Sequence, residues 1–397
     1  MRSIAFAASS CILLTLAVPA RATPDIHRAG GATVHAKFGE GVGIEASDGS
    51  FGLTLKARMQ LRGTVVETDN DSDASADIQI RRLRLTLEGF ALRKRLTYKI
   101  QLAAASLDLD PVAPLIVRDA YANYALHRDV EVRFGQMKVP FGRQRVVSSG
   151  SLQMVDRSIV TSEFNLDRDV GVQALSNDLF GLGEHLGYSV GIFGGDGRGR
   201  VSGGYGLLYA ARLEVRAFGG RRAVELDEPD FARAHTARLA FGVSAAFNQK
   251  TDRNRSTIGP VFATGTWASY AHLGFDSTFK FAGISLTNEF FLRKATEDAN
   301  VERVEGKQVT DYARSGYGGF LQGGYLLTPE LELVGRVGGI YPIGVPNVSS
   351  DPVKEVGGGL SYYFVRHALK LQADYFRLIE TQGEGRHQVR LQVQFAP

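Results

Sequence analysis

The chain has 397 residues, among them 46 Gly, 23 Phe and 14 Tyr, but only one Trp and one Cys. Charged residues make up 22% and the formal net charge is +4, which excludes a disordered polymer and is too mild to indicate nucleic-acid binding, since such binders gather basic residues on one face. A helical membrane protein is excluded as well, because it would need apolar runs of about 20 residues.

The first 22 residues have the features of a cleaved export signal. A basic start at residues 1–3 precedes a mostly apolar stretch over residues 4–18, and Ala20-Arg21-Ala22 forms a small-x-small cleavage site. A retained membrane anchor is the alternative, but the apolar part is short for one. The single cysteine, Cys11, lies in this signal, so the exported chain must be stable without a disulfide.

Residues 23–50 contain several glycines and no heptad pattern, and we expect a flexible periplasmic lead-in there. From Phe51 onward, apolar residues alternate with polar ones such as Lys56 and Arg58 for about fifteen residues. A strand of a soluble protein is usually about 5–6 residues long, whereas a membrane-spanning strand needs about 9–11. The length of the alternation therefore indicates a strand that crosses a membrane.

The same two-residue period returns along the whole chain, and sixteen such stretches fit between Phe51 and Pro397. The parity changes once, between Ile80 and Leu83, which predicts a β-bulge. Lipid offers no partners to backbone N–H and C=O groups, so a sheet in the membrane must have no edge. We predict an all-β fold, a transmembrane antiparallel β-barrel of about 16 strands that occupies residues 51–397.

The connections between these stretches alternate in length. Long links lie near residues 67–77, 106–115, 137–167, 194–205, 249–268, 295–311 and 341–353, and tight ones at 91–95, 127–129, 282–283, 328–329 and 366–367. The links at 177–185 and 219–234 are longer than a tight turn, and 381–386 is short for a long loop. Short periplasmic turns opposite longer outer loops are typical of outer-membrane barrels. We therefore expect a cell outer membrane (Gram-negative) location with lipid as a partner.

Basic residues gather on the predicted inner face of the first three strands, where Glu88 is the only acidic residue. They are Lys56, Arg58, Arg62, Arg82, Arg84 and Lys99. Guanidinium and ammonium groups bind phosphate and carboxylate oxygens, so this row favours anions in a water-filled lumen. The alternative is that these side chains pair with acids and stiffen the wall, the acids being Glu88, Asp119, Glu131, Glu214 and Glu289.

The longest link adds four more basic candidates, namely Lys138, Arg143, Arg145 and Arg157. It opens with the sequence G-Q-M-K-V-P-F-G over residues 135–142 and continues with Ser148-Ser149 and R-D-V-G over residues 168–171. With these motifs the chain resembles the phosphate-selective porin O and P family. Residues 81–84, 98–101 and 119–121 are also similar to that family.

The resemblance implies a sixteen-stranded, trimeric porin whose third outer loop folds into the lumen and narrows it beside a basic ladder. It makes Lys138 and Arg143 constriction candidates, with Lys56, Arg58, Arg82 and Arg84 in the wall. The loop has arginines that do not match the phosphate-binding lysines of the family one to one. The resemblance therefore supports an anion pore more firmly than it supports phosphate.

The sequence thus predicts a channel for passive diffusion of small anions, phosphate or phosphate-like solutes, that works as a homotrimer without a cofactor or nucleic acid. The His residues show no H-x-x-x-H or H-E-x-x-H spacing, which argues against a metal site. Three alternatives remain open: a barrel hydrolase using His235 or His272, a general porin without phosphate selectivity, and a soluble β-repeat protein.

Overall fold

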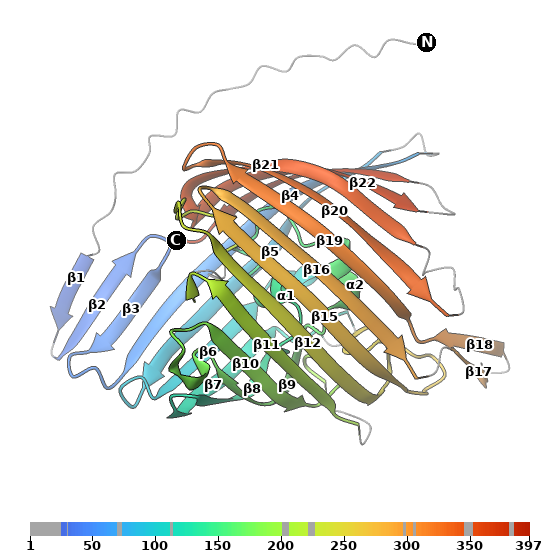
Figure 1. Cartoon of the computed structure of the whole chain (residues 1–397), viewed down its shortest axis with the longest axis horizontal. Coiled ribbons are helices and arrows are strands. Elements are labelled where there is room, and N and C mark those ends of the chain that lie inside the picture. The colour runs from blue at the N-terminus through green and yellow to red at the C-terminus, as the bar shows by residue number, and fades with distance from the viewer. Residues whose placement is uncertain are drawn as a thin grey trace, which may run out of the picture.

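The computed structural model describes residues 25–29, 31–69, 74–111, 114–200, 206–220, 227–296, 299–304, 307–344, 352–380 and 385–397. Nineteen strands form one sheet. Three of them, β1 (Asp25–Ala29), β2 (Ala32–Lys37) and β3 (Gly41–Ala46), form a meander beside the barrel (Figure 1). The other sixteen are β4 (Gly52–Thr68), β5 (Ser75–Ala91), β6 (Leu96–Ala103), β7 (Val117–His127), β8 (Val130–Lys138), β9 (Arg168–Ser176), β10 (Leu186–Phe193), β11 (Leu208–Phe218), β12 (Arg238–Thr251), β15 (Ala268–Phe281), β16 (Ile284–Ala295), β19 (Ser315–Leu326), β20 (Leu331–Ile343), β21 (Val353–His367), β22 (Leu369–Glu380) and β23 (Arg386–Phe395).

These sixteen strands close on themselves, because the last one, β23, pairs with the first one, β4. Their antiparallel register runs from Arg386 opposite Thr68 to Phe395 opposite Met59. Each barrel strand therefore has two neighbours, which satisfies the backbone hydrogen bonds that lipid cannot supply. The predicted all-β barrel of about sixteen strands is confirmed.

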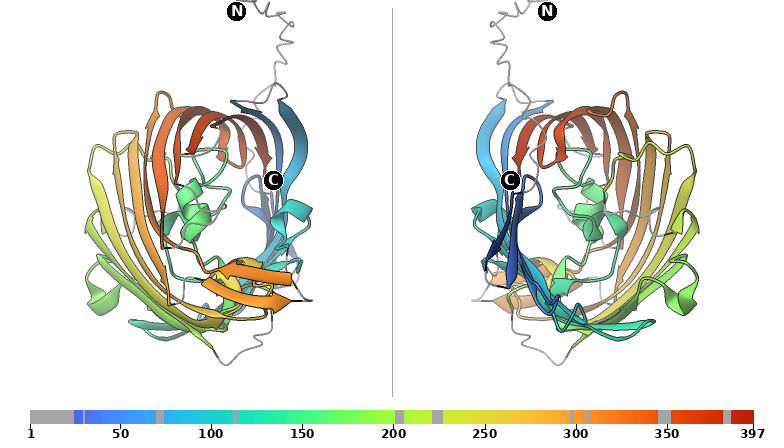
Figure 2. Two further views of the ribbon diagram at one scale, coloured as in Figure 1. Left: turned by 90° about the vertical axis from the view of Figure 1, so that its right-hand side faces the viewer. Right: turned by 90° about the vertical axis from the view of Figure 1, so that its left-hand side faces the viewer.

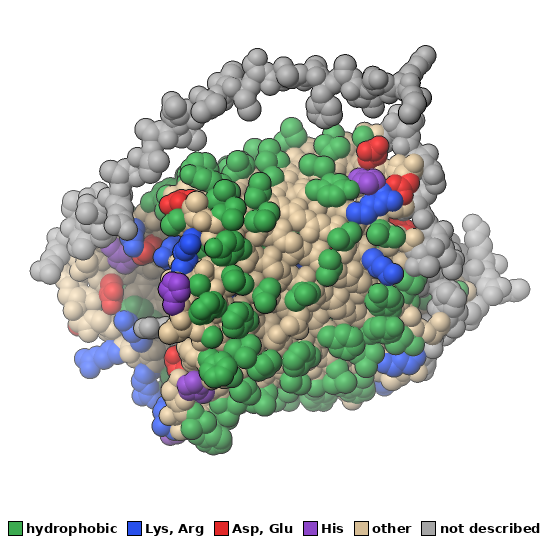
Figure 3. Space-filling model, turned by 45° about the horizontal axis from the view of Figure 1, so that its top comes forward, with side chains coloured by type: hydrophobic (Ala, Val, Ile, Leu, Met, Phe, Trp, Pro, Cys, Tyr) green, Lys and Arg blue, Asp and Glu red, His purple; other side chains and the backbone are tan. Residues whose placement is uncertain are grey.

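Side chains alternate between the two faces of the wall. In β12, β15 and β16 nearly every second residue is buried. The residues that alternate with the buried ones include exposed apolar residues such as Val243 in β12 and Leu273 in β15, both 54% exposed. Figure 3 shows hydrophobic side chains spread over the outer wall, with the charged ones toward its two ends. An apolar outer band of this kind suits contact with lipid, and it leaves the polar residues to the inner face.

The predicted bulge between residues 80 and 83 is also confirmed. Gln60 pairs with Arg82 while the next residue, Leu61, pairs with Ile80, so Arg81 is the extra residue in β5. The bulge shifts the side-chain parity by one position. As a result, the side chains of Arg82 and Arg84 are buried on the inner face.

Long connections lie at one rim of the barrel, the long-loop rim, and shorter ones at the other, the short-turn rim. The links 177–185, which contains η2 (Leu179–Gly181), and 219–237 both lie at the short-turn rim despite their length. The link between β6 and β7 carries the short helix η1 (Ser106–Asp108). Two long links contain hairpins that the sequence did not indicate, β13 (Arg253–Arg255) with β14 (Ile258–Val261), and β17 (Ala299–Val304) with β18 (Lys307–Tyr312). Strands of three to six residues are too short for their alternation to stand out.

The described part of residues 23–50 is not the flexible lead-in that we expected. β1, β2 and β3 pair in sequence, and β3 pairs with the start of β4, from Val42 opposite Leu55 to Glu45 opposite Gly52. Gly31 and Gly39 adopt φ values of +85° and +84° in the turns of this meander, which glycine tolerates best. The predicted export signal, residues 1–22, lies outside the described residues. None of the described helices is long and apolar enough to cross a membrane.

Candidate functional site

The connection between β8 and β9, residues 139–167, will be called the β8–β9 segment. It contains two short helices, α1 (Arg143–Val146) and α2 (Ile159–Phe164). When the barrel is viewed along its length, the green turns of this segment appear within the outline of the ring of strands (Figure 2). Its residues form hydrogen bonds with side chains of β4, β5, β16, β20, β21 and β22.

Aromatic packing anchors both ends of the segment to β16. The ring centroids of Phe141 and Phe291 lie 5.5 Å apart, those of Phe164 and Phe291 lie 6.2 Å apart, and all three side chains are buried. Burial of one such ring contributes about 2 kcal/mol. Gly142, at φ +70°, lets the chain turn directly after Phe141, and a Cβ there would lie 2.9 Å from the ring of Phe291. The P-F-G part of the motif therefore has a structural role.

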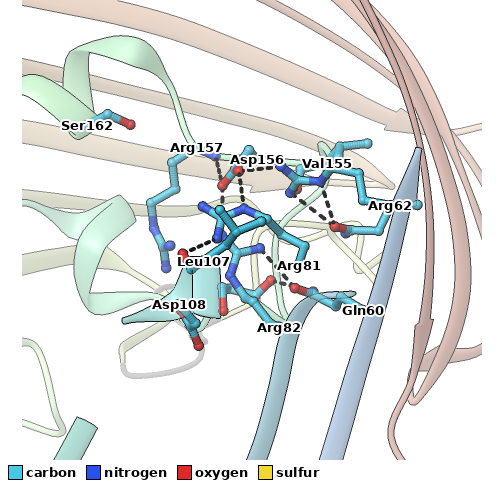
Figure 4. A network of polar contacts seen from close by, with 12 residues as sticks. Gln60, Arg62, Arg81, Arg82, Leu107, Asp108, Val155, Asp156, Arg157 and Ser162 are labelled. Carbon is cyan, nitrogen blue, oxygen red and sulfur yellow. Dashed lines mark hydrogen bonds and ion pairs between the residues drawn. The ribbon is translucent and has the colours of Figure 1, made fainter. Parts of the chain in front are cut away.

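Asp156 ties the β8–β9 segment to strands β4 and β5 (Figure 4). Its carboxylate lies 2.9 Å from Nη1 of Arg62, 3.0 Å from Nη2 of Arg82 and 3.9 Å from Nε of Arg81. Burial alone would raise the pKa of Asp156, but the charges of Arg82, Arg62 and Arg81 outweigh it and hold that pKa well below its ordinary value. Arg62 and Arg82, two predicted site residues, are thus paired with a carboxylate of the segment.

Glu163 of α2 forms a second tie, on the opposite side of the segment. Its carboxylate lies 2.5 Å from Arg293, 3.1 Å from Arg314 and 3.2 Å from Arg255. Burial opposes ionisation, yet the three guanidinium groups lower the pKa of Glu163. This carboxylate joins the segment to β13, to β16 and to the end of the link that precedes β19.

Three other predicted residues of the early strands, Lys56, Lys99 and Arg84, are also paired with acids. Lys56 and Lys99 share Glu88, with 3.3 Å between Nζ of Lys99 and the carboxylate. Arg84 donates two hydrogen bonds of 2.6 and 2.7 Å to Asp108 in η1. On the β8–β9 segment, Arg145 pairs with Asp167, and Arg143 is buried in α1.

Arg58 has neutral partners instead. Its two terminal nitrogens each donate a 3.0 Å hydrogen bond, one to the hydroxyl of Ser148 and one to that of Ser149. Gly150 makes this approach possible, because a Cβ there would lie 2.1 Å from Nη1 of Arg58. Within the described residues, no carboxylate forms an ion pair with Arg58.

Lys138 and Arg157 likewise bind backbone carbonyl groups. Lys138 donates to the carbonyl of Val146 at 2.7 Å, and Arg157 donates to those of Gln144 and Val147 at 2.8 and 2.7 Å. Burial and the nearby charge of Arg82 lower the pKa of Arg157 to about 9. The guanidinium group of Arg157 is therefore still charged at neutral pH. Among the described residues it is held by backbone carbonyl groups and not by an ion-paired acid. Such a cation favours a bound anion.

A cavity of about 480 Å³ lies between the β8–β9 segment and strands β5 to β11. Five predicted residues line it, namely Arg84, Lys99, Lys138, Arg145 and Arg157. The other five, Lys56, Arg58, Arg62, Arg82 and Arg143, are not part of its lining. The structure therefore brings half of the predicted set to the cavity. Of the other half, Arg58, Arg62 and Arg82 contact the β8–β9 segment.

Five further cations of the lining were missed from the sequence, and they are Arg118, Arg133, Arg168, Arg212 and Arg216. Ten basic side chains thus face the cavity, against three acidic ones, Asp119, Glu214 and Asp227. Two of the missed residues carried a usable signal, because Arg212 and Arg216 alternate with the exposed residues Leu213 and Val215. The excess of positive charge suits small anions.

The two histidines considered for a hydrolase are placed differently. His272 is buried edge-on to Phe141, and neither ring nitrogen has a hydrogen-bond partner among the described residues. His235 packs against Phe281 near the short-turn rim. No group of three or more His, Asp, Glu or Cys side chains in the described part of the chain is arranged to hold a metal ion.

A family model for phosphate-selective porin O and P matches residues 53–395, which span the whole barrel. The chain belongs to this porin family. Its motifs over residues 135–149 therefore lie in a porin barrel, where they begin the β8–β9 segment and supply the partners of Arg58. No curated protein matches the chain at a significant level of sequence similarity.

Solved outer-membrane proteins share the fold of this porin. A loop-deletion mutant of OmpT from Vibrio cholerae matches with a TM-score of 0.56 at 11% identity, covering 87% of this chain and 99% of its own. The outer-membrane channel DcaP of Acinetobacter baumannii matches with 0.55 at 14% identity, covering 89% and 99%. OmpF of Salmonella typhi, in complex with daunomycin, matches with 0.56 at 14% identity, covering 88% and 99%. At such identities the likeness concerns the fold, and family and fold together support an outer-membrane channel.

Proposed function

We propose that this porin is a passive diffusion channel for small anions, with phosphate or phosphate-like solutes preferred. It is exported by a signal over residues 1–22, inserts in the outer membrane of a Gram-negative bacterium and assembles as a homotrimer. A trimer form of OmpT from Vibrio cholerae, similar to this chain with a TM-score of 0.52 at 10% identity, supports trimer assembly. No bond is made or broken and no cofactor takes part.

The observation that carries this proposal is the cavity with ten basic and three acidic side chains in its lining. An anion that enters such a space loses part of its hydration, and guanidinium N–H, ammonium and serine O–H groups replace it. The same charges repel cations. In this proposal the β8–β9 segment folds into the lumen and confines solutes to the side of β5 to β11.

Passage also requires that the anion can leave. Several lining arginines share their charge with an acid, since Arg168 lies 2.7 Å from Asp119 and Arg216 lies 2.7 Å from Glu214. Because these acids partly neutralise the arginines, each arginine binds a passing anion only weakly. The lining cations that have no ion-paired acid among the described residues keep the electrostatic potential of the cavity positive. We infer a row of weak sites rather than one tight one.

Single-channel recordings of the full-length exported protein in planar bilayers test this function. With chloride as the conducted ion, added phosphate should reduce the current in a saturable manner. An unchanged chloride current at millimolar phosphate would contradict the phosphate preference and would favour the alternative, a general porin without phosphate selectivity.

A further inference from the structure

The connection between β11 and β12 is unusually long for the short-turn rim, and its described residues approach the β8–β9 segment. Residues 227–231, Asp227-Glu228-Pro229-Asp230-Phe231, will be called the short-rim segment. Both inner carboxylates are buried, with 5% of Glu228 and 1% of Asp230 exposed. A buried carboxylate is stable only with hydrogen-bond or ion-pair partners. The partners of Glu228 and Asp230 therefore identify the parts of the barrel that this segment connects.

The short-rim segment is fixed to the wall near β12 and β15 along most of its length. Asp230 accepts a 2.9 Å hydrogen bond from the backbone N–H of Gly283 and pairs with Arg238. Lys280 donates to the carbonyl groups of Asp227 and Pro229 at 2.6 and 3.2 Å. These contacts come from strands and a turn of the barrel wall, so they give the segment a rigid base.

The last residue of the segment reaches strand β21. The ring of Phe231 stands edge-on to Tyr363 with 4.8 Å between centroids, and edge-on to His367 with 5.1 Å. The short-rim segment therefore spans from β12 and β15 to β21. Asp227 also lines the basic cavity, so one side of the segment borders the proposed anion path.

Glu228 joins this segment to the β8–β9 segment. Its backbone N–H donates to the carbonyl of Ser151 at 3.1 Å. Its carboxylate accepts from the backbone N–H of Gln153 at 2.8 Å and from the side-chain amides of Gln144 and Gln322 at 3.2 and 3.1 Å. Three of these four partners belong to the β8–β9 segment, and they lie on both sides of Ser148 and Ser149, the partners of Arg58.

We propose that Glu228 is a positioning residue that holds the β8–β9 segment from the short-turn rim, so that two segments from opposite rims build the constriction together. Hydrogen bonds to an ionised carboxylate are the strong kind, and a carboxylate that accepts several of them fixes their donors in one geometry. The inference rests on the proposed channel function but not on its preference for anions.

Single-channel recording of the full-length Glu228→Ala variant tests this role. Without the carboxylate, Gln144 and Gln153 lose their shared partner, and the time spent in substates of altered conductance should rise about tenfold. Glu228→Gln keeps an acceptor oxygen and should restore much of the parent behaviour. Asp252→Asn is the matched control, because Asp252 pairs with Arg200 outside the β8–β9 segment. A well-folded Glu228→Ala channel with parent noise, conductance and reversal potential would overturn the proposal.

A disulfide provides a second test that does not depend on the alanine variant folding. The backbones of Ser151 and Glu228 are joined by one hydrogen bond, and the chain has no cysteine after Cys11. Under oxidising conditions the double variant Ser151→Cys/Glu228→Cys should form a disulfide and conduct with few substates of altered conductance. Reduction of the disulfide should make these substates more frequent. Failure to cross-link, or identical records before and after reduction, would overturn the proposal. If the parent itself forms no channel, the proposed function fails instead.

Discussion

The carboxylate of Asp156 lies 3.0 Å from the guanidinium group of Arg82, and it thereby joins the β8–β9 segment to the wall strand β5. This pair shows how the basic residues are divided between two tasks. Acids on connections, such as Asp108 and Asp156, neutralise some wall arginines and fix the connections in place. Cations such as Lys138 and Arg157 bind only neutral oxygens among the described residues. We propose that this second group attracts anions.

Asp156→Asn should loosen the β8–β9 segment without opening the barrel. The substitution leaves Arg62 and Arg82 without their counter-charge, and breaking such a pair costs about 2–3 kcal/mol when one partner is partly exposed. We expect faster proteolysis within residues 139–167 and a sheet spectrum, by circular dichroism, equal to that of the parent. Equal protease resistance of the variant and the parent would argue against the tie.

The two acidic ties should make the segment sensitive to acid. The pKa values of Asp156 and Glu163 are both lowered in the folded protein. Their stabilising contribution is therefore present above the unfolded pKa values of about 4, and it is lost as the pH falls through the lowered folded values. Open-channel noise should stay constant from pH 7 to about pH 4 and rise below it. Noise that rises between pH 7 and pH 5 would point to other groups.

Arg157→Gln should weaken the phosphate block of chloride current about tenfold, because a charge-assisted contact with the anion is replaced by a neutral one. Arg386→Gln is the control, since Arg386 pairs with Glu380 and is not part of the cavity lining. The measurement is the phosphate concentration that halves the chloride current. Equal shifts in both variants would indicate a general charge effect and not a site at Arg157.

Arg133→Glu should reduce the preference for anions through long-range charge. Arg133 lines the cavity, stacks on Tyr121 at 4.7 Å and donates to Asn123, and it has no ion-paired acid among the described residues. Charge reversal there should move the reversal potential in a chloride gradient toward zero. Arg133→Lys keeps the charge and should leave that potential near the parent value. A shift in the lysine variant as large as that in the glutamate variant would mean that packing, not charge, is responsible.

The barrel could be predicted because its cause is local. Lipid outside and water inside impose a two-residue period on every strand, and even the bulge at Arg81 is visible as a change of parity. The short strands β1 to β3 were not predicted, because a strand of five or six residues between glycine turns cannot be told from a loop by its sequence. Several basic residues of the cavity were likewise recognised from parity or from a motif.

The partners of those residues could not be predicted. Asp108 and Asp156 lie in connections without a period, and they meet Arg84 and Arg82 only because the chain folds back on the wall. The alternation assigned Arg82 to the inner face but carried no information about which carboxylate would reach it. For the same reason, the sequence did not separate the cations that line the cavity from those that fix its walls.

The reversal potential of the full-length protein in a planar bilayer, under a potassium chloride gradient, is the most direct test of anion selectivity. With ten basic and three acidic side chains along the cavity, we predict a potential close to that of a chloride-selective membrane. A potential of the opposite sign, which favours potassium, would contradict it.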